Sequence, residues 1–465
     1  MLTRIGQSFT DLFTRYMPSA FVFALLLTLI TGVSAMIIIG SSPLDVISGW
    51  YEGFFDLLAF GMQITLIVIT GYSIAISPVV GRMIDQLANR ISTPKQVYLF
   101  IMLVGALLCL VSFGWVVITA VLARELALRI KGVHYPFLVA CVYFSGGSWV
   151  CGLSSSIPLL LNTENNFLME ADILSSVIPT SFTLGSTLNI VMLVVFMVFV
   201  PILVLILIPK PKHIVELSDQ LSEPAASKED SIEAEAASYK LPFKALSDGL
   251  NNSWLLQMTV AVIGVFYICY YFYKNGFDLN FNIMIFIFII IGLLMHKTPL
   301  RYTIAMKRSS SNISGILFQY PFYAGIMGIM IHTGLGSRTA ELMASVATEN
   351  SYSVFSYFTG GLMNFAIPSA GGEFAVVGPS IISAVTEIGA GLPEVQITNM
   401  VARAAMSIAY GESLSNLMQP FFLLLVFPVM GQGIKIQARD VMGYLVLPFT
   451  IMLAIQLLII SVVPL

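Results

Sequence analysis

The sequence contains one short pattern twice: Tyr143-Phe144-Ser145-Gly146-Gly147 and Tyr357-Phe358-Thr359-Gly360-Gly361. Each copy is followed, after six residues, by a small and polar stretch. These stretches are Ser154-Ser155-Ser156-Ile157-Pro158 and Pro368-Ser369-Ala370-Gly371-Gly372. The same offset of 214 residues relates both pieces. Each half of the chain therefore has a Gly- and Ser-rich interruption within apolar sequence.

A second pair of interruptions lies farther along. Gly185-Ser186-Thr187-Leu188-Asn189 precedes Pro201, and Glu412-Ser413-Leu414-Ser415-Asn416 precedes Pro428, with an offset of 227 for the Asn and the Pro. Small residues also let membrane helices pack closely, which could explain either block alone. Two blocks in the same order, each with a constant offset, favour another interpretation. Paired, interrupted apolar segments in two halves are typical of the binding site of a secondary transporter.

The amino-acid composition indicates that the chain lies in a membrane. The chain has 465 residues, of which 57% are hydrophobic and 10% charged, and its mean hydropathy is +0.90. Soluble domains carry about 25% charged residues, so we expect an all-α integral membrane protein. The net charge of −3 gives no reason to expect nucleic acid as a partner. The four cysteines form no Cys-x-x-Cys motif and have no histidine at metal-binding spacing, which predicts free thiols and no cofactor.

Apolar runs divide the first half, residues 1–209, into membrane segments, since a spanning helix needs roughly 20 apolar residues. Each apolar arm beside the triple serine is too short to cross. Irregular backbone at that depth must be covered by protein or water. We therefore predict spans at 17–39, 57–77 and 97–122, a re-entrant hairpin at about 136–169 with its tip near Ser154–Ser156, and a helix at 173–208 broken around Gly185–Asn189.

A polar stretch separates the halves. Residues 210–250 are rich in Ser, Ala, Pro and charged side chains, which predicts a flexible linker with no apolar face, dispensable for transport. The second half, 251–465, mirrors the first. We predict spans at 253–273, 280–296 and 312–334, a hairpin at about 352–388, a broken helix at 396–430 and a last span at 441–463.

The positive-inside rule orients these segments. With the N-terminus inside, the loops holding Arg82, Lys297 and Lys435 all fall on the cytoplasmic side. The equally basic segment 124–131 falls outside, unless residues 97–131 cross twice around Gly114. An inverted repeat also requires the first hairpin to enter from the cytoplasm. These alternatives give a range of about nine to eleven crossings besides the two hairpins.

The interruptions suit a small carboxylate. A buried carboxylate needs hydrogen bonds in place of its water, and hairpin tips, helix N-termini and hydroxyl groups supply donors without a fixed cation. We expect the four interrupted segments to meet near mid-membrane, within about 15 Å, the span of one small pocket. The candidate substrate-binding residues are Ser154, Ser155, Ser156, Ser369, Gly371, Gly372, Ser186, Thr187, Asn189, Ser413 and Asn416.

Acidic and amide side chains within predicted spans indicate ion coupling. An acidic residue in a span costs about 2.5–3.5 kcal/mol on insertion scales and is rarely without a function. Glu412 could carry a proton or bind Na⁺; alternatively, it could face a water-filled crevice or bond a neighbouring helix. A proton site predicts uptake that falls as the pH rises, whereas a Na⁺ site predicts a Na⁺ requirement. The coupling candidates are Glu412, Glu373, Asn364 and Gln419, with Na⁺ possible near Asn189, Asn416 and Glu412.

Several stretches together resemble one family. They are Leu57-Leu-Ala-Phe-Gly-Met-Gln63, Leu294-Met-His-Lys-Thr-Pro299, Phe318-Gln-Tyr-Pro-Phe-Tyr-Ala-Gly325, Asn364-Phe-Ala-Ile-Pro-Ser369 with Gly371-Gly372, and Ala409-Tyr-Gly-Glu412 through Gln419-Pro420. They look like the bacterial short-chain fatty acid transporters, the acetoacetate and butyrate permeases of the ion-transporter superfamily. The resemblance implies inverted repeats, two hairpins, a dimerising scaffold, an elevator-type transport domain and uptake of small monocarboxylates across the bacterial inner membrane. Glu373 departs from the neutral or imidazole side chain expected there.

Other classes fit less well. A different small carboxylate, such as a dicarboxylate or an amino-acid-like molecule, remains an alternative substrate. An anion channel needs pore rings from an oligomer, whereas this chain has two different half-sites. An intramembrane enzyme needs a nucleophile beside a base, and the serines have no neighbouring His or Lys. The sequence thus predicts a cation-coupled carboxylate transporter that is not an enzyme.

Overall fold

The computed structural model of the chain describes residues 15–16, 18–56, 58–163, 166–210, 214–221, 231–239, 241–243, 245–276, 281–310 and 313–465. Within these ranges every regular element is helical. Five helices are long and apolar enough to cross a membrane, or up to seven if each of two bent helix pairs is one span. The residues where we expected four spans to begin, 17, 57, 280 and 312, lie outside the described ranges.

The chain begins with outer helices. They are α2 (Ala20–Ser34), which continues as a π-helical turn over Ala35–Ile39, α3 (Pro43–Asp56), α4 (Leu58–Ala75) and α5 (Pro78–Ala88). Residues 40–56 separate the first two predicted spans and are not a loop. Instead they form α3, which packs along α19 (Ser314–His332). Apolar side chains at helical spacing, Val46, Trp50 and Phe54, explain this packing.

The predicted span at 97–122 is instead a hairpin. Its arms are α6 (Pro94–Val111) and α7 (Val116–Arg129), joined by a 3₁₀ turn over Phe113–Trp115. Both ends of the hairpin lie together, because the backbone N–H of His134 donates to Tyr98 Oη at 2.8 Å. Ser112 is extended (φ −155°, ψ 132°), which ends α6 and turns the chain. Residues 97–131 thus reverse direction around Gly114. The alternative in which they cross the membrane twice stays a prediction.

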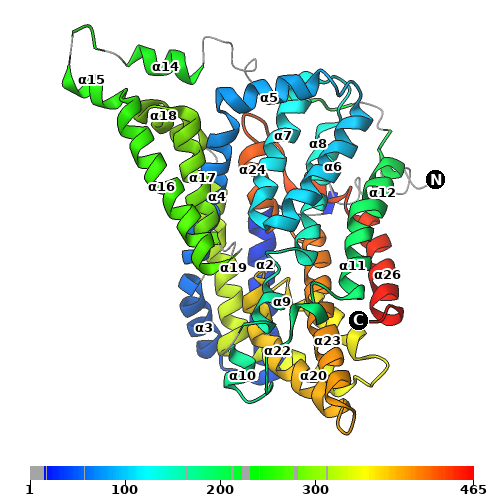
Figure 1. Cartoon of the computed structure of the whole chain (residues 1–465). Helices are drawn as coiled ribbons and strands as arrows, with labels where there is room; N and C mark the ends of the chain where they lie inside the picture. Colours follow the sequence, from blue (N-terminus) through cyan, green and yellow to red (C-terminus); the bar gives the residue numbers. More distant parts are fainter. Residues whose placement is uncertain are drawn as a thin grey trace.

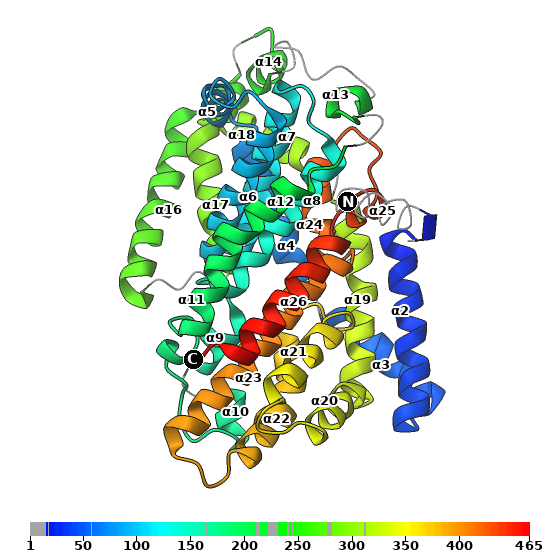
Figure 2. The same ribbon diagram turned by 90° about the vertical axis from the view of Figure 1, so that its right-hand side faces the viewer.

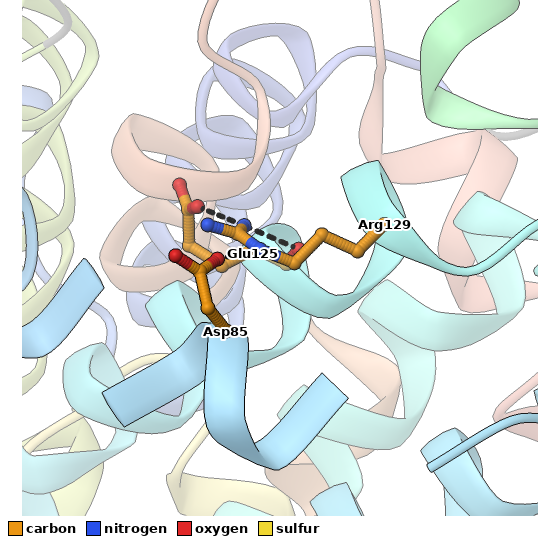
Figure 3. Close-up of polar contacts among 3 residues, drawn as sticks. All are labelled: Asp85, Glu125 and Arg129. Atoms are coloured by element: carbon orange, nitrogen blue, oxygen red, sulfur yellow. Dashed lines mark hydrogen bonds and ion pairs between the residues drawn. The ribbon is translucent and has the colours of Figure 1, made fainter. Parts of the chain in front are cut away.

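An ion-pair cluster fixes the returning end of this hairpin. Arg129 pairs with Asp85 of α5 at 2.8 Å and with Glu125, one turn earlier in α7, at 2.5 Å (Figure 3). The basic segment 124–131 therefore lies at the same end of the molecule as the Arg82 loop. This end is the upper one in Figure 1, where α5 lies beside α7. The positive-inside rule assigns it to the cytoplasm.

The hairpin predicted at 136–169 is corrected as well. Residues 135–161 run as one candidate span of 27 residues, made of α8 (Tyr135–Ser145), a 3₁₀ helix over Gly146–Cys151 and, after a short break, α9 (Ser156–Leu161). The Gly- and Ser-rich stretch tightens into 3₁₀ geometry and does not reverse the chain. We call 135–161 the first broken helix and 94–129 the first hairpin.

The predicted break at Gly185–Asn189 is a helix start. After α10 (Phe167–Glu170) and a 3₁₀ turn over Thr180–Phe182, helix α11 begins at Thr187, because Ser186 caps it by accepting from the Asn189 N–H at 3.2 Å. Helix α11 (Thr187–Val194) continues through a π-helical turn over Val195–Phe199 into α12 (Val200–Leu207). The 173–208 segment is thus a helix from 187 to 207.

The described parts of the linker are docked, contrary to our expectation of a flexible segment. Helices α13 (Leu217–Gln220), α14 (Ile232–Ser238) and α15 (Leu246–Asn251) lie in it. Ile232 and Ala236 of α14 pack on α18 (Pro299–Ser309), and Glu235 pairs with Arg308 at 2.5 Å. The apolar face that we missed has only two residues one helical turn apart. It was therefore hidden in the polar sequence.

The first broken helix holds another part of the linker. The Val215 carbonyl accepts from the Tyr135 N–H at 2.9 Å, and the Val215 N–H donates to His134 Nδ1 at 3.1 Å. Burial lowers the pKa of His134 to about 4, so the ring is neutral at physiological pH and its Nδ1 can accept. The linker thus connects the cytoplasmic end of the first broken helix with α18.

The second half follows its predicted segments closely. Helices α16 (Trp254–Asn275), α17 (Phe281–His296), α19 and α20 (Leu335–Ser345) precede a hairpin of α21 (Tyr352–Met363) and α22 (Ala370–Ile388). The second broken helix is α23 (Glu394–Ser415), a 3₁₀ turn over Asn416–Met418 and α24 (Leu423–Met430), bent by 44°. Helices α25 (Ala438–Met442) and α26 (Val446–Val462) end the chain.

The two hairpins enter the molecule from opposite ends. In Figure 1, α7 of the first hairpin lies in the upper half, whereas α22 of the second lies at the bottom beside α20. The outer helices α2 and α16 lie on opposite sides in the view of Figure 2, and both present exposed apolar side chains that suit lipid. The interior between them is where the hairpin tips and both broken helices meet.

Candidate functional site

The two broken helices cross at their interruptions and bond each other reciprocally. Tyr143 Oη of α8 donates to the Asn416 carbonyl at 2.5 Å, within the break of the second broken helix. Ser413 Oγ of α23 donates to the Gly147 carbonyl at 3.0 Å, within the break of the first. A 3₁₀ segment leaves carbonyl oxygens without helical partners, and these two hydroxyl groups satisfy them. The crossing point is therefore fixed from both sides.

The tip of each hairpin is bound to the broken helix of its own half. In the first half, the Phe113 N–H donates to Ser154 Oγ at 3.0 Å, and the Leu153 N–H donates to the Leu110 carbonyl at 2.7 Å. Ser154, predicted to bind substrate, thus holds the hairpin tip. Ser155 is buried, and its Oγ has no partner among the described residues, whereas Ser156 is exposed at the start of α9.

The second tip is held by an amide network. Asn364 Nδ2 lies within hydrogen-bond distance of three acceptors: the Glu412 carbonyl at 3.0 Å, Ser415 Oγ at 2.7 Å and Asn416 Oδ1 at 2.6 Å. Gln419 Nε2 donates to Asn416 Oδ1 at 2.9 Å. The structure thus brings together Asn364, Asn416, Gln419 and Glu412, all of which the sequence analysis selected.

A cavity lies at the crossing point. It is small, about 20 Å³, and lies between the first hairpin tip, the first break and the second break. Its polar wall is formed by Tyr143, Ser413 and Asn416 and by the Gly146–Gly147 backbone. The remaining wall is apolar and largely aromatic, formed by Phe113, Val116, Trp149, Leu417, Phe422, Leu425 and Val426. The cavity is suited to a small molecule with one polar and one apolar end.

Two buried carboxyl groups lie beside the second tip. Glu373 of α22 and Glu412 of α23 are 0% and 1% exposed, and they are close enough for their charges to interact. Both carboxyl oxygens of Glu373 and Oε2 of Glu412 lack a hydrogen-bond partner in the described part of the chain. Unpartnered acceptors at full burial are costly unless a proton or cation occupies the site.

Neutral acceptors in the same region are also unpartnered. Asn364 Oδ1 and Gln419 Oε1 are buried without a hydrogen-bond partner among the described residues. Oxygen atoms of carboxylates and amides are ligands for hard cations, so this chemistry suits Na⁺ as well as a proton. No group of three or more His, Cys, Asp or Glu side chains suited to a metal occurs in the described ranges.

Other predicted residues have supporting positions. Asn189 connects the first break to α23, because its Nδ2 donates to the Cys151 carbonyl at 3.2 Å and Tyr410 Oη donates to its Oδ1 at 3.0 Å. Ser186 and Thr187 begin α11. Ser369 is extended before α22, and its carbonyl accepts from the Glu373 N–H at 2.6 Å. Gly371 and Gly372 lie in the first turn of that helix, and neither lines the cavity.

Sequence reasoning missed the aromatic residues of the site. Phe113, Tyr143, Trp149 and Phe422 line the cavity, but an aromatic residue in an apolar run is also what a lipid-facing helix contains. A signal was present, because three of them lie beside Gly114, Gly146–Gly147 and Pro420. Glycine and proline interrupt helices, and side chains at an interruption face protein more often than lipid.

The chain is similar to one family of known proteins over its whole length. A family model described as "Short chain fatty acid transporter" matches residues 1–465. A protein of Escherichia coli strain K12 named "Putative short-chain fatty acid transporter" is 35% identical over 445 residues, 96% of each chain. A protein of Haemophilus influenzae strain Rd with the same name is 33% identical over 449 residues, also 96% of each chain.

Two solved structures are similar over nearly the whole chain but only weakly. The antimetabolite efflux pump MtrF of Neisseria gonorrhoeae is 15% identical, with a TM-score of 0.38, and the match covers 98% of this chain and 97% of that one. The YdaH transporter of Alcanivorax borkumensis is 13% identical, with a TM-score of 0.37 and 97% of both chains covered.

Proposed function

This chain belongs to the short chain fatty acid transporter family, and from that premise we propose that it takes up short-chain monocarboxylates such as acetoacetate and butyrate by cation-coupled symport. It is a multi-pass membrane protein, and family membership indicates that it is a transporter rather than an enzyme. The proposal includes an elevator-type movement and a homodimer in the bacterial inner membrane.

The cavity at the helix crossing carries the proposal. Its polar wall presents the Asn416 amide and the Ser413 hydroxyl, which would exchange its bond to the Gly147 carbonyl for one to a carboxylate. Its opposite wall presents apolar and aromatic side chains to a short tail. Among the described residues, no lysine or arginine lines it. A carboxylate held by neutral donors is bound weakly enough to leave again, as transport requires.

The buried carboxyl pair supports cation coupling. A carboxylate that enters against a negative-inside potential meets a barrier of about 2.3 kcal/mol per charge per 100 mV, so accumulation needs at least one inward cation. Glu373 and Glu412 provide acidic oxygens next to the substrate cavity, and Glu412 is adjacent to Ser413 of the cavity wall. Loading these oxygens with H⁺ or Na⁺ would couple the cation to the anion.

The arrangement of the hairpins supports alternating access. They enter from opposite ends, so each tip can close the cavity toward one side of the membrane (Figure 1). The reciprocal bonds of Tyr143 and Ser413 tie both broken helices into one unit that can move as a body. The outer helices α2, α3, α16 and α17 would then form the stationary scaffold and the dimer contact.

The test is uptake of labelled butyrate by the purified protein in proteoliposomes. We expect competition by C2–C6 monocarboxylates but not by dicarboxylates or amino acids, and accumulation that requires a Na⁺ or an inward proton gradient. Counterflow separates a carrier from a channel, because only a carrier exchanges internal for external substrate. Uptake without counterflow, or strongest competition by a dicarboxylate, would contradict the proposal.

A further inference from the structure

We propose that Phe113, Trp149 and Phe422 form an aromatic box that sets the chain length of the transported acid. The inference rests on the proposed function and adds the residues that determine specificity. The three rings come from three separate elements: the first hairpin tip, the first break and the loop before α24. All three line the cavity at the helix crossing.

The rings stand edge to face around Phe113. The ring centroids of Phe113 and Trp149 are 5.8 Å apart with planes at 64°, and those of Phe113 and Phe422 are 5.5 Å apart at 88°. Edge-to-face pairs at this spacing are the favoured aromatic geometry. The three rings therefore form one packed wall, with Phe113 between the other two.

Each side of the wall is supported from behind. The Phe113 N–H bonds Ser154 Oγ at 3.0 Å, which fixes the tip that carries the ring. Phe422 packs against Phe421 at 5.1 Å between ring centroids, and Phe421 is itself fully buried against Tyr320 at 4.7 Å and Tyr323 at 4.6 Å. A wall supported in this way cannot move away at low cost when a longer tail arrives.

The polar wall fixes the direction of the substrate. The polar groups of the lining are Tyr143, Ser413, Asn416 and the Gly146–Gly147 backbone, so a carboxylate would lie on that side and the tail toward the aromatic and aliphatic side. To donate to the carboxylate, the Tyr143 or Ser413 hydroxyl would exchange its bond to the Asn416 or Gly147 carbonyl. Each added methylene then advances toward the aromatic wall. One methylene in a closed apolar pocket changes the specificity of a protein about 10- to 200-fold, so a fixed wall produces a sharp limit.

The experiment measures chain-length profiles of full-length variants in proteoliposomes. Counterflow of labelled butyrate is competed with straight-chain acids from C2 to C8, for the wild type, Trp149→Ala and Phe422→Ala. We expect the half-inhibitory concentration of hexanoate and octanoate to fall about tenfold or more in the variants, while that of acetate and butyrate rises. Phe167→Ala is the matched control, because Phe167 packs edge to face on Phe374 outside the cavity lining and should leave the profile unchanged.

Conservative variants guard against loss of folding. Trp149→Phe and Phe422→Leu should shift the profile in the same direction but less. A profile that stays unchanged in every box variant that still exchanges butyrate overturns the inference and leaves the proposed function intact. A wild-type protein that exchanges no C2–C6 acid overturns both. A profile shift in Phe167→Ala equal to that in Trp149→Ala also overturns the inference, because the effect would then be general loosening.

Discussion

The two units of hairpin and broken helix, residues 94–161 and 352–430, share one construction but differ in chemistry. In each, the first arm of the hairpin crosses its broken helix at small residues, Gly105 on Ser145 and Gly361 on Gly411. In each, the hairpin tip is hydrogen-bonded to the break. The first tip is aromatic and held through its backbone, whereas the second carries amides and lies beside two buried carboxyl groups.

This difference indicates a division of roles. Both units line the apolar wall, the first with Phe113, Val116 and Trp149 and the second with Leu417, Phe422, Leu425 and Val426. Within the described residues, the buried carboxyl pair that we propose for coupling lies in the second unit. Burying an ionised carboxyl group in a membrane costs free energy. Its negative charge would also repel the carboxylate of a nearby substrate, unless a cation binds between them.

The largest effect is expected at the crossing of α21 and α23. A Cβ on Gly411 would overlap the backbone carbonyl of Tyr357, which cannot move alone, so Gly411→Val should remove folded protein. At the crossing of the first unit, a Cβ on Gly105 of the hairpin arm would meet the side chains of Ser145 and Thr119 in place of backbone, so Gly105→Ala should cost less. Yield of monodisperse protein after extraction measures both, with Gly81→Ala as a control where the space is open. Equal yields of Gly411→Val and wild type would contradict the crossing.

The next largest effect is expected at the second tip. Asn364→Ala removes the amide that joins the tip to Glu412, Ser415 and Asn416. Leaving such buried acceptors unsatisfied costs about 1–3 kcal/mol, so uptake should fall about 5- to 100-fold with folded protein retained. Initial uptake rates measure this. If Asn364→Ala changes the chain-length profile and leaves accumulation normal, the proposed difference between the two units is wrong.

A smaller effect is expected at the first tip. Ser154→Ala leaves the Phe113 N–H without its acceptor and loosens one side of the aromatic wall, so the KM for butyrate should rise several-fold with little change in accumulation. Ser154→Thr keeps a hydroxyl and should restore most of the affinity. Loss of accumulation in Ser154→Ala at saturating substrate would place coupling chemistry in the first unit and contradict the division.

The smallest effect is expected where the linker docks. The Glu235–Arg308 ion pair is partly exposed, and such pairs contribute about 0–1 kcal/mol, so Glu235→Gln should change uptake less than about twofold. Ile232→Asp places a charge on the packed face and should increase proteolysis within 231–238. If proteolysis is unchanged, α14 does not depend on this face.

The second unit could be predicted from sequence because its interruptions are polar. Asn364, Glu412, Asn416 and Gln419 stand out in apolar runs, and the hairpin and broken helix there begin and end close to the predicted residues. Their meeting also follows from chemistry, since buried amides need partners.

The first unit could not be predicted in the same way. Two of the four residues of its hairpin tip, Ser112-Phe113-Gly114-Trp115, are aromatic, and the tip resembles part of one continuous apolar span. The repeated Tyr-Phe-small-Gly-Gly pattern lies in the first broken helix in one half and in the second hairpin in the other. We therefore predicted a hairpin in both halves. Glycines at a close helix crossing and glycines in a turn look alike in a sequence. Only the contact between Tyr98 and His134, which closes the hairpin, distinguishes the two.

The accumulation ratio of butyrate for Glu412→Gln, measured in proteoliposomes under imposed Na⁺ and proton gradients, tests the division of roles most directly. We predict that Glu412→Gln fails to accumulate butyrate against its gradient, yet still exchanges it by counterflow with the wild-type chain-length profile. The neutral amide keeps the size of the side chain but takes up no proton and has no negative charge to balance a bound cation. A Glu412→Gln protein that accumulates butyrate as the wild type does would contradict the account.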